Sequence, residues 1–192
     1  MKLKTKLSYL TSIVLAASTF GVQAKPVEWD MIPEQSQLTF VATQNGSPLN
    51  GKFNSFTANL NVDPNDLEHS SIDIIIDINS ASLSYNEIKK TLLASDWFNV
   101  KMFPKAEFKA TQFKKTGDNA YQALGTLTIR DKSLPVTLSF TSTFPDEKTG
   151  VVMGSTVLKR TAFGVGQGEW SSVDQVKDDV TVNFKVTATK KQ

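Results

Sequence analysis

Residues 121–140 read YQALGTLTIRDKSLPVTLSF, and this stretch decides the class of fold. Apolar or small residues stand at every second position on both sides of a polar turn at 130–133. They are Tyr121, Ala123, Gly125, Leu127 and Ile129 before the turn, and Leu134, Val136, Leu138 and Phe140 after it. A period of two indicates a strand with one buried face. Two such runs joined by a short charged turn predict an antiparallel hairpin.

The same alternation recurs on both sides of this hairpin. It is clearest in 180–189, 71–78, 56–62 and 38–43, and further strands are expected at 106–113 and 151–158. About eight short antiparallel strands indicate an all-β protein, either a sandwich or a single closed barrel. Small residues on the inner face favour a barrel with room for a ligand, although small residues also complement large neighbours in a filled core. These small positions are Ala42, Ala58, Ala110, Ala123, Gly125 and Ala188.

One long segment breaks the strand pattern, SYNEIKKTLLASDWFNVKMFPKAEF at 84–108. Ser84 and Glu87 have the spacing of a capping box, which predicts one short mid-chain helix. The expected apolar stripe of this helix comprises Tyr85, Ile88 and Leu92. Because the aromatic residues that follow need a buried surface, we expect the segment to lie across an open end or face of the barrel.

The first 24 residues have the pattern of a secretory signal peptide. Three lysines precede a short apolar run, and Val22-Gln23-Ala24 is a small-x-small cleavage pattern. The sequence therefore predicts a soluble mature domain over 25–192, exported through a cleaved signal. An uncleaved membrane anchor is the alternative, although the apolar run is shorter than a membrane span requires.

Composition excludes several classes of function. Loss of the three signal-peptide lysines leaves 18 basic against 19 acidic side chains, so nothing predicts binding to nucleic acid. The chain has no cysteine and one histidine, His69, which the sequence places in a polar turn. Nucleophile–histidine catalysis and common zinc sites therefore lack their residues. The acidic residues around His69 do not have the spacing of a calcium loop. We predict no catalytic residue, no metal and no required cofactor.

Several short motifs, taken in order, resemble the YceI-like family of periplasmic polyisoprenoid-binding proteins. They are Pro33-x-x-Ser36 with Leu38-x-Phe40, Gly51-Lys52-Phe53, Asp96-Trp97-Phe98-Asn99-Val100, Phe103-Pro104-Lys105-Ala106-Glu107-Phe108, Gly125-Thr126-Leu127-Thr128-Ile129-Arg130, Pro135-Val136-Thr137-Leu138, and Lys159-Arg160-Thr161-Ala162-Phe163-Gly164. The resemblance covers nearly all of the mature chain. It implies a periplasmic protein with a lipocalin-like barrel whose apolar bore holds a long isoprenoid chain.

The chain departs from many relatives at polar positions. Gln35 and Gln44 stand where histidines are common, Ile88-Lys89-Lys90-Thr91-Leu92 replaces a motif with Arg, Asp and His, and Ala162 replaces an acid. The pattern resembles the subgroup that accompanies b-type cytochrome membrane proteins. That resemblance implies an isoprenoid quinone as a plausible cargo and such a cytochrome as a partner. The oligomeric state is not predicted, and a dimer is one of the states the sequence permits.

The resemblance and the alternation together select candidate ligand contacts. The expected lining of the bore is Phe40, Phe53, Phe56, Ile74, Ile76, Leu92, Trp97, Phe98, Phe108, Leu127, Leu138, Phe140, Phe163 and Phe184. The head-group candidates at its mouth are Gln44, Lys89 and Arg160. Each lining residue could instead belong to an ordinary core.

Three functions remain open from the sequence. The leading hypothesis is a periplasmic carrier of an isoprenoid lipid, either a polyprenyl lipid or an isoprenoid quinone. The second is an enzyme that acts on such a lipid, which the lack of a paired reactive constellation disfavours. The third is a filled barrel that regulates a membrane redox partner.

Overall fold

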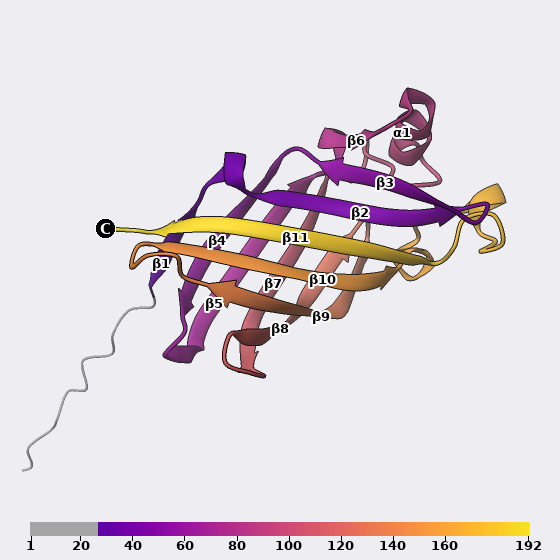
Figure 1. Cartoon of the computed structure of the whole chain (residues 1–192). Helices are drawn as coiled ribbons and strands as arrows, with labels where there is room; N and C mark the ends of the chain where they lie inside the picture. The colour runs from indigo at the N-terminus through magenta and orange to yellow at the C-terminus, as the bar shows by residue number, and fades with distance from the viewer. Residues whose placement is uncertain (1–26) are drawn as a thin grey trace, which may run out of the picture.

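The predicted hairpin is present in a computed structural model that describes residues 27–192 (Figure 1). It consists of β8 (Ala120–Ile129) and β9 (Lys132–Thr143), which pair from Ala120 with Thr141 to Ile129 with Lys132. The turn contains only Arg130 and Asp131, so it is two residues shorter than the sequence predicted. Arg130 takes a positive φ of 55°, the left-handed conformation that two-residue hairpin turns require.

Eight strands close into a barrel, as the sequence predicted. Hydrogen-bonded neighbours run in the order β1, β4, β5, β7, β8, β9, β10 and β11, and β1 pairs back onto β11. The bounds not yet given are β1 (Glu28–Met31), β2 (Gln37–Gln44), β3 (Ser47–Phe53), β4 (Phe56–Asp63), β5 (Asp66–Asp77), β6 (Ala81–Leu83), β7 (Lys105–Lys115), β10 (Thr149–Lys159) and β11 (Asp179–Lys190). All the pairings are antiparallel.

Three sides of the barrel are each formed by two strands that follow one another in the chain. β1 and β2 lie along the same edge of β11, separated by the 3₁₀ turn Pro33–Gln35. β3 leads into β4, and β5 leads into β6 through the 3₁₀ turn Ile78–Ser80. At this turn the chain leaves β7, because β5 pairs with β7 whereas β6 pairs with β3. The wall therefore has an opening between β6 and β7.

The segment at 84–104 fills this opening. Its helix α1 (Asn86–Leu93) lies beside β6 at one end of the barrel (Figure 1). The main chain after α1 folds back under it, because the N–H groups of Phe98 and Val100 donate to the carbonyls of Leu92 and Leu93 at 3.0 and 3.2 Å. This arrangement confirms the short helix and its place across an open part of the barrel.

The detailed prediction for the start of the helix was wrong. Tyr85 is the N-cap residue, and no side chain caps the first turn, so Ser84 and Glu87 do not form a capping box. Tyr85 is 67% exposed instead of lying on a buried stripe. The side chains that turn inward from this helix come from its last turn, where Leu92 and Leu93 lie.

Two further 3₁₀ segments in the last connection complete the described chain. Arg160–Phe163 and Gly168–Trp170 are 3₁₀ turns in the connection between β10 and β11. Within residues 27–192, no helix has the length and apolar character needed to cross a membrane. The expected signal peptide at 1–24 lies outside the described residues.

Candidate ligand-binding cavity

An apolar cavity of about 300 Å³ runs through the barrel. At one end its wall includes Trp29, Pro64, Leu67 and Phe144. The wall at the other end includes Val176, close to the start of β11. These two ends are opposite, because they lie at the two ends of the paired strands β10 and β11. Phe144 is close to the end at which Thr149 pairs with Thr189, and Val176 is close to the end at which Lys159 pairs with Asp179. The cavity therefore extends along the axis of the barrel.

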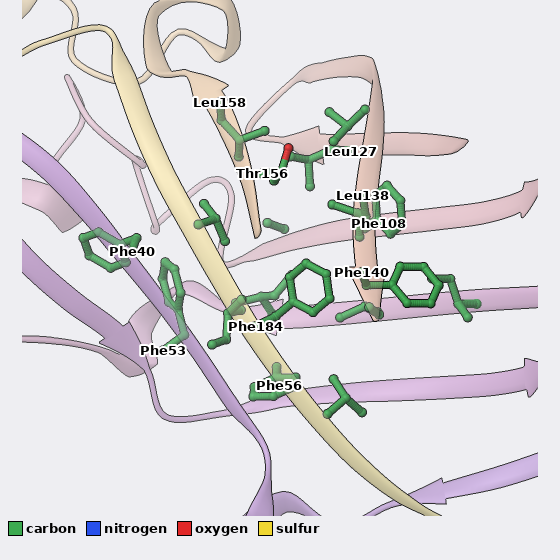
Figure 2. Close-up of a pocket in the computed structure, with 18 of the residues that line it drawn as sticks. Phe40, Phe53, Phe56, Phe108, Leu127, Leu138, Phe140, Thr156, Leu158 and Phe184 are labelled. Carbon is green, nitrogen blue, oxygen red and sulfur yellow. The ribbon is translucent and has the colours of Figure 1, made fainter. Parts of the chain in front are cut away.

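All fourteen predicted lining residues lie on the wall of this cavity. Figure 2 shows six of the phenylalanine rings together, from β2, β3, β4, β7, β9 and β11. Alternation found those that lie on strands, because one face of every strand points inward. Leu92, Trp97, Phe98 and Phe163 lie outside the strands, where alternation carries no information. The role of these side chains as lipid contacts stays a prediction.

Sequence reasoning missed some lining residues, for two reasons. Val182 and Val186 follow the same alternation as Phe184, so the signal for them was present in the sequence. Pro64, Leu67 and Phe144 lie in or beside turns, where period-two alternation carries no information.

Glycines let several of these rings lie flat against the wall. Gly51 faces Phe40 across the β2–β3 pair, and a Cβ on Gly51 would lie 2.7 Å from the Cε1 atom of Phe40. Gly154 faces Phe184 on β11 in the same way, and a Cβ on Gly154 would lie 2.6 Å from the Cζ atom of Phe184. A ring held over a neighbouring glycine occupies the space of the missing side chain and leaves the centre of the bore open.

Some of the predicted small inward positions serve the packing of large side chains instead of the cavity. Gly125 accommodates the ring of Phe108, because a Cβ there would lie 2.7 Å from Cζ. Ala110 and Ala123 are buried in the same cluster and are not on the cavity wall. Ala42 and Ala188 do line the cavity. Both interpretations left open by the sequence therefore apply, at different positions.

Gly51→Ala should push the ring of Phe40 away from the wall and into the bore. We expect the free energy of unfolding of the lipid-free protein to fall by about 1–3 kcal/mol, the usual cost of overpacking. Because the three atoms nearest to this Cβ all belong to the Phe40 ring, the cost should nearly vanish in a Phe40→Leu background. Urea unfolding of the four variants measures both effects, with Gly117→Ala as a control in an open turn. An equal cost in both backgrounds would show that Phe40 is not the obstacle.

Arg160 is a buried cation at the α1 end of the cavity. Its side chain is 4% exposed, and the guanidinium lies 5.4 Å from the centre of the Trp97 ring. Burial lowers the pKa of Arg160, and the nearby Asp178 carboxylate opposes this shift. The guanidinium donates to six backbone carbonyls at 2.9–3.2 Å, those of Val165, Gly166, Trp170, Ser172, Val176 and Lys177.

This network changes the interpretation of Arg160. A guanidinium has five N–H donors, and here they are all directed at main-chain carbonyls. None remains for a lipid head group, so Arg160 holds the connection between β10 and β11 in place. The sequence could not show this, because the carbonyls belong to a connection without a regular pattern.

The two other head-group candidates are not on the cavity wall. Gln44 ends β2, where it forms an isolated bridge with Val176. Lys89 lies half-buried on α1. The structure therefore does not bring the three candidates together around the cavity.

Main-chain segments cover the cavity at the α1 end. Arg130 joins two of them, because its Nη1 donates to the carbonyls of Trp97 at 2.5 Å and Gly164 at 2.7 Å. The Gln167 N–H also donates to the Asp96 carbonyl at 2.7 Å. We call the segments at 84–104 and 160–178 together the latched cover.

Polar chemistry is sparse inside the cavity. The polar side chains on its wall are those of Trp29, Tyr121, Ser142, Thr156, Arg160 and Trp97. Among the described residues, no group of three or more His, Asp or Glu side chains is placed to hold a metal ion. His69 lies on β5 and not in a turn, and Asp66 raises its pKa through a 2.8 Å contact at the surface. This arrangement suits the binding of an apolar chain and offers no evident nucleophile–base pair.

An eight-stranded antiparallel barrel around an apolar bore defines a lipocalin-like binding protein. The YceI-like domain family matches residues 29–188. The chain belongs to this family.

Several relatives are similar over much of the chain. The crystal structure of Burkholderia cenocepacia BcnA is 32% identical, with a TM-score of 0.80 over 83% of this chain and 100% of that one. A UPF0312 protein of Pectobacterium atrosepticum is 30% identical over 137 residues, 71% of each chain. A UPF0312 protein of Yersinia pestis is 34% identical over 90 residues, and the chain spans about half the length of that relative, 46%.

A more distant structure shares the fold. It is described as a polyisoprenoid binding domain from Saccharophagus degradans implicated in plant cell wall breakdown. It is 11% identical, with a TM-score of 0.68 over 88% of this chain and 100% of that domain.

Proposed function

We propose that this protein is a carrier that holds one long-chain isoprenoid lipid in the bore of its barrel. The observation that carries the proposal is the apolar cavity of about 300 Å³, whose lining comes from all around the barrel. The fold shared with a polyisoprenoid binding domain supports the same class of ligand. The protein performs no chemistry on the lipid in this proposal.

The hydrophobic effect supplies the driving force. Each Å² of apolar surface removed from water contributes about 25 cal/mol, so a chain of several isoprene units gains many kcal/mol in such a bore. Aromatic rings that lie over glycines give the wall surfaces against which a methyl-branched chain can pack. Shape then selects the chain, and the few polar side chains impose little selection on the head group.

An isoprenoid quinone is the cargo that we favour over a polyprenyl phosphate. A quinone is neutral, and the described residues on the cavity wall include no free cation, because the donors of Arg160 are used by the main chain. The resemblance of the sequence to proteins that accompany b-type cytochromes points to the same cargo. A membrane cytochrome of that type is therefore the proposed partner, and co-purification from solubilised membranes tests it.

We place the mature protein in the periplasm. The basic start, the short apolar run and Val22-Gln23-Ala24 predict cleavage between Ala24 and Lys25. Sequencing the N-terminus of protein from a periplasmic extract should return Lys25 as the first residue. An intact Met1 on protein from the cytoplasm would contradict this placement.

A transfer assay tests the carrier function. Delipidated protein is incubated with vesicles that contain ubiquinone-2, a quinone with two isoprene units, and is then separated from the vesicles. We expect up to one unchanged quinone per chain in the protein fraction. A chemically altered quinone would support an enzyme instead, and a barrel that takes up none would support the filled interaction module.

A further inference from the structure

We propose that the lipid enters and leaves at the end of the barrel opposite α1, through a mouth framed by Trp29 and Phe144. This inference rests on the proposed function, because it concerns the route to the same cavity. The two rings come from β1 and from the turn between β9 and β10. Figure 1 shows β1 and the C-terminal end of β11 at the opposite end of the barrel from α1.

Phe144 connects the cavity with the surface. It lies on the cavity wall and is nevertheless 49% exposed. Of all the lining residues in the described chain, it alone is exposed, and the others are buried or half-buried. At the α1 end, Tyr85, Met102 and Val173 are exposed apolar side chains, and none of the three is on the wall.

Among the described residues, two aromatic side chains stand at the mouth. The rings of Trp29 and Phe144 are tilted against each other with centroids 6.0 Å apart, and Gly150 leaves space beneath both. Trp29 is held in place, because its indole N–H donates to the Val62 carbonyl at 2.8 Å. Phe144 follows the last residue of β9 and carries no polar group that could fix its ring. A rotation of one phenyl ring about its side-chain bonds is therefore enough to widen the mouth.

The opposite end would be harder to open. There the latched cover is made of two chain segments, and hydrogen bonds from Arg130 and Arg160 to main-chain carbonyls hold them in place. Its opening would also separate Trp97 from Trp170, whose rings lie 5.7 Å apart. Side-chain rotation takes place in nanoseconds, whereas movement of packed segments is slower by orders of magnitude. Exchange should therefore use the mouth.

The absence of cysteine from the chain allows a plug to be placed at either end. Phe144→Cys and Met102→Cys are each labelled with biotin through a disulfide and then capped with streptavidin. Glu147→Cys, in the same turn as Phe144, repeats the first plug without altering the mouth itself. Each labelled protein is exposed to ubiquinone-2 vesicles for set times, and the quinone that it has taken up is extracted and measured. The measurement is made both before and after the disulfide is reduced.

We expect the plugs at 144 and 147 to slow uptake by about tenfold or more, because they raise the free-energy barrier to lipid entry. Reduction of the disulfide should restore the original rate. The plug at 102 should leave the rate unchanged. Slower uptake with the plug at 102, or equal rates with all plugs, would overturn the proposed route. An unplugged parent protein that takes up no quinone would instead overturn the carrier function.

Discussion

Arg160→Ala should lower the free energy of unfolding by about 3–5 kcal/mol, as expected when a buried, fully bonded cation is removed. The guanidinium is 4% exposed and donates to six main-chain carbonyls. Removing it leaves those carbonyls without their donor in the connection between β10 and β11. Arg160→Lys should recover only a small part of the loss, because one ammonium group cannot reach carbonyls on several sides.

Urea unfolding of delipidated protein measures this effect, with Lys159→Ala as the control. Lys159 is next in the chain, is exposed, and forms a surface ion pair with Asp179, so its removal should cost less than about 1 kcal/mol. A loss for Arg160→Ala as small as that of the control would refute the anchoring role. Exchange of backbone N–H hydrogens should also rise most at 160–178, since this connection contains the carbonyls that lose their donor and should become more mobile.

Val182→Phe should reduce bound lipid by about tenfold or more while leaving the lipid-free barrel nearly as stable as the parent. Val182 is half-buried on the cavity wall, so an added ring has empty space to occupy. That ring excludes part of the chain, and each excluded carbon forfeits about 0.8 kcal/mol, so the loss of one isoprene unit weakens binding more than tenfold. In a filled core the same change would cost about 1–3 kcal/mol of stability instead.

The matched control is Asn183→Phe, one residue further along the same strand. Its side chain points away from the bore, because neighbouring residues of a strand face opposite sides. This control should retain the full lipid content. Stability must be compared after lipid removal, since a bound ligand itself stabilises the fold. Destabilisation of lipid-free Val182→Phe together with normal lipid content would contradict an open bore.

The sequence could predict the barrel because the signal is repeated along nearly every strand. Period-two alternation identified the strands, and together with the family resemblance it selected fourteen side chains that prove to line one cavity. It could not predict where the chain passes from one strand to the next within a side of the barrel. At Ile78–Ser80, for example, the chain changes its pairing partner from β7 to β3, and a change of partner leaves no mark on the alternation. The opening between β6 and β7 therefore depends on which strands pair, and the alternation of apolar residues does not reveal this.

The polar details of the site were less predictable for a related reason. Arg160 was a head-group candidate because polar residues at the mouth of an apolar bore select the head group. Its real partners are carbonyls, which every residue carries and which no sequence motif reveals. Phe144 was missed because it follows the end of a strand. Its contact with Trp29 joins residues more than a hundred positions apart.

Native mass spectrometry of the protein as isolated, followed by organic extraction of the same sample, tests the central claim most directly. We predict a complex of one chain with one lipid, and an extracted species that fragments in C5H8 steps and carries a quinone ring. Val182→Phe should lose this mass, and Asn183→Phe should keep it. A protein recovered from its native host without any bound isoprenoid, or with straight-chain fatty acids in stoichiometric amount, would contradict the account.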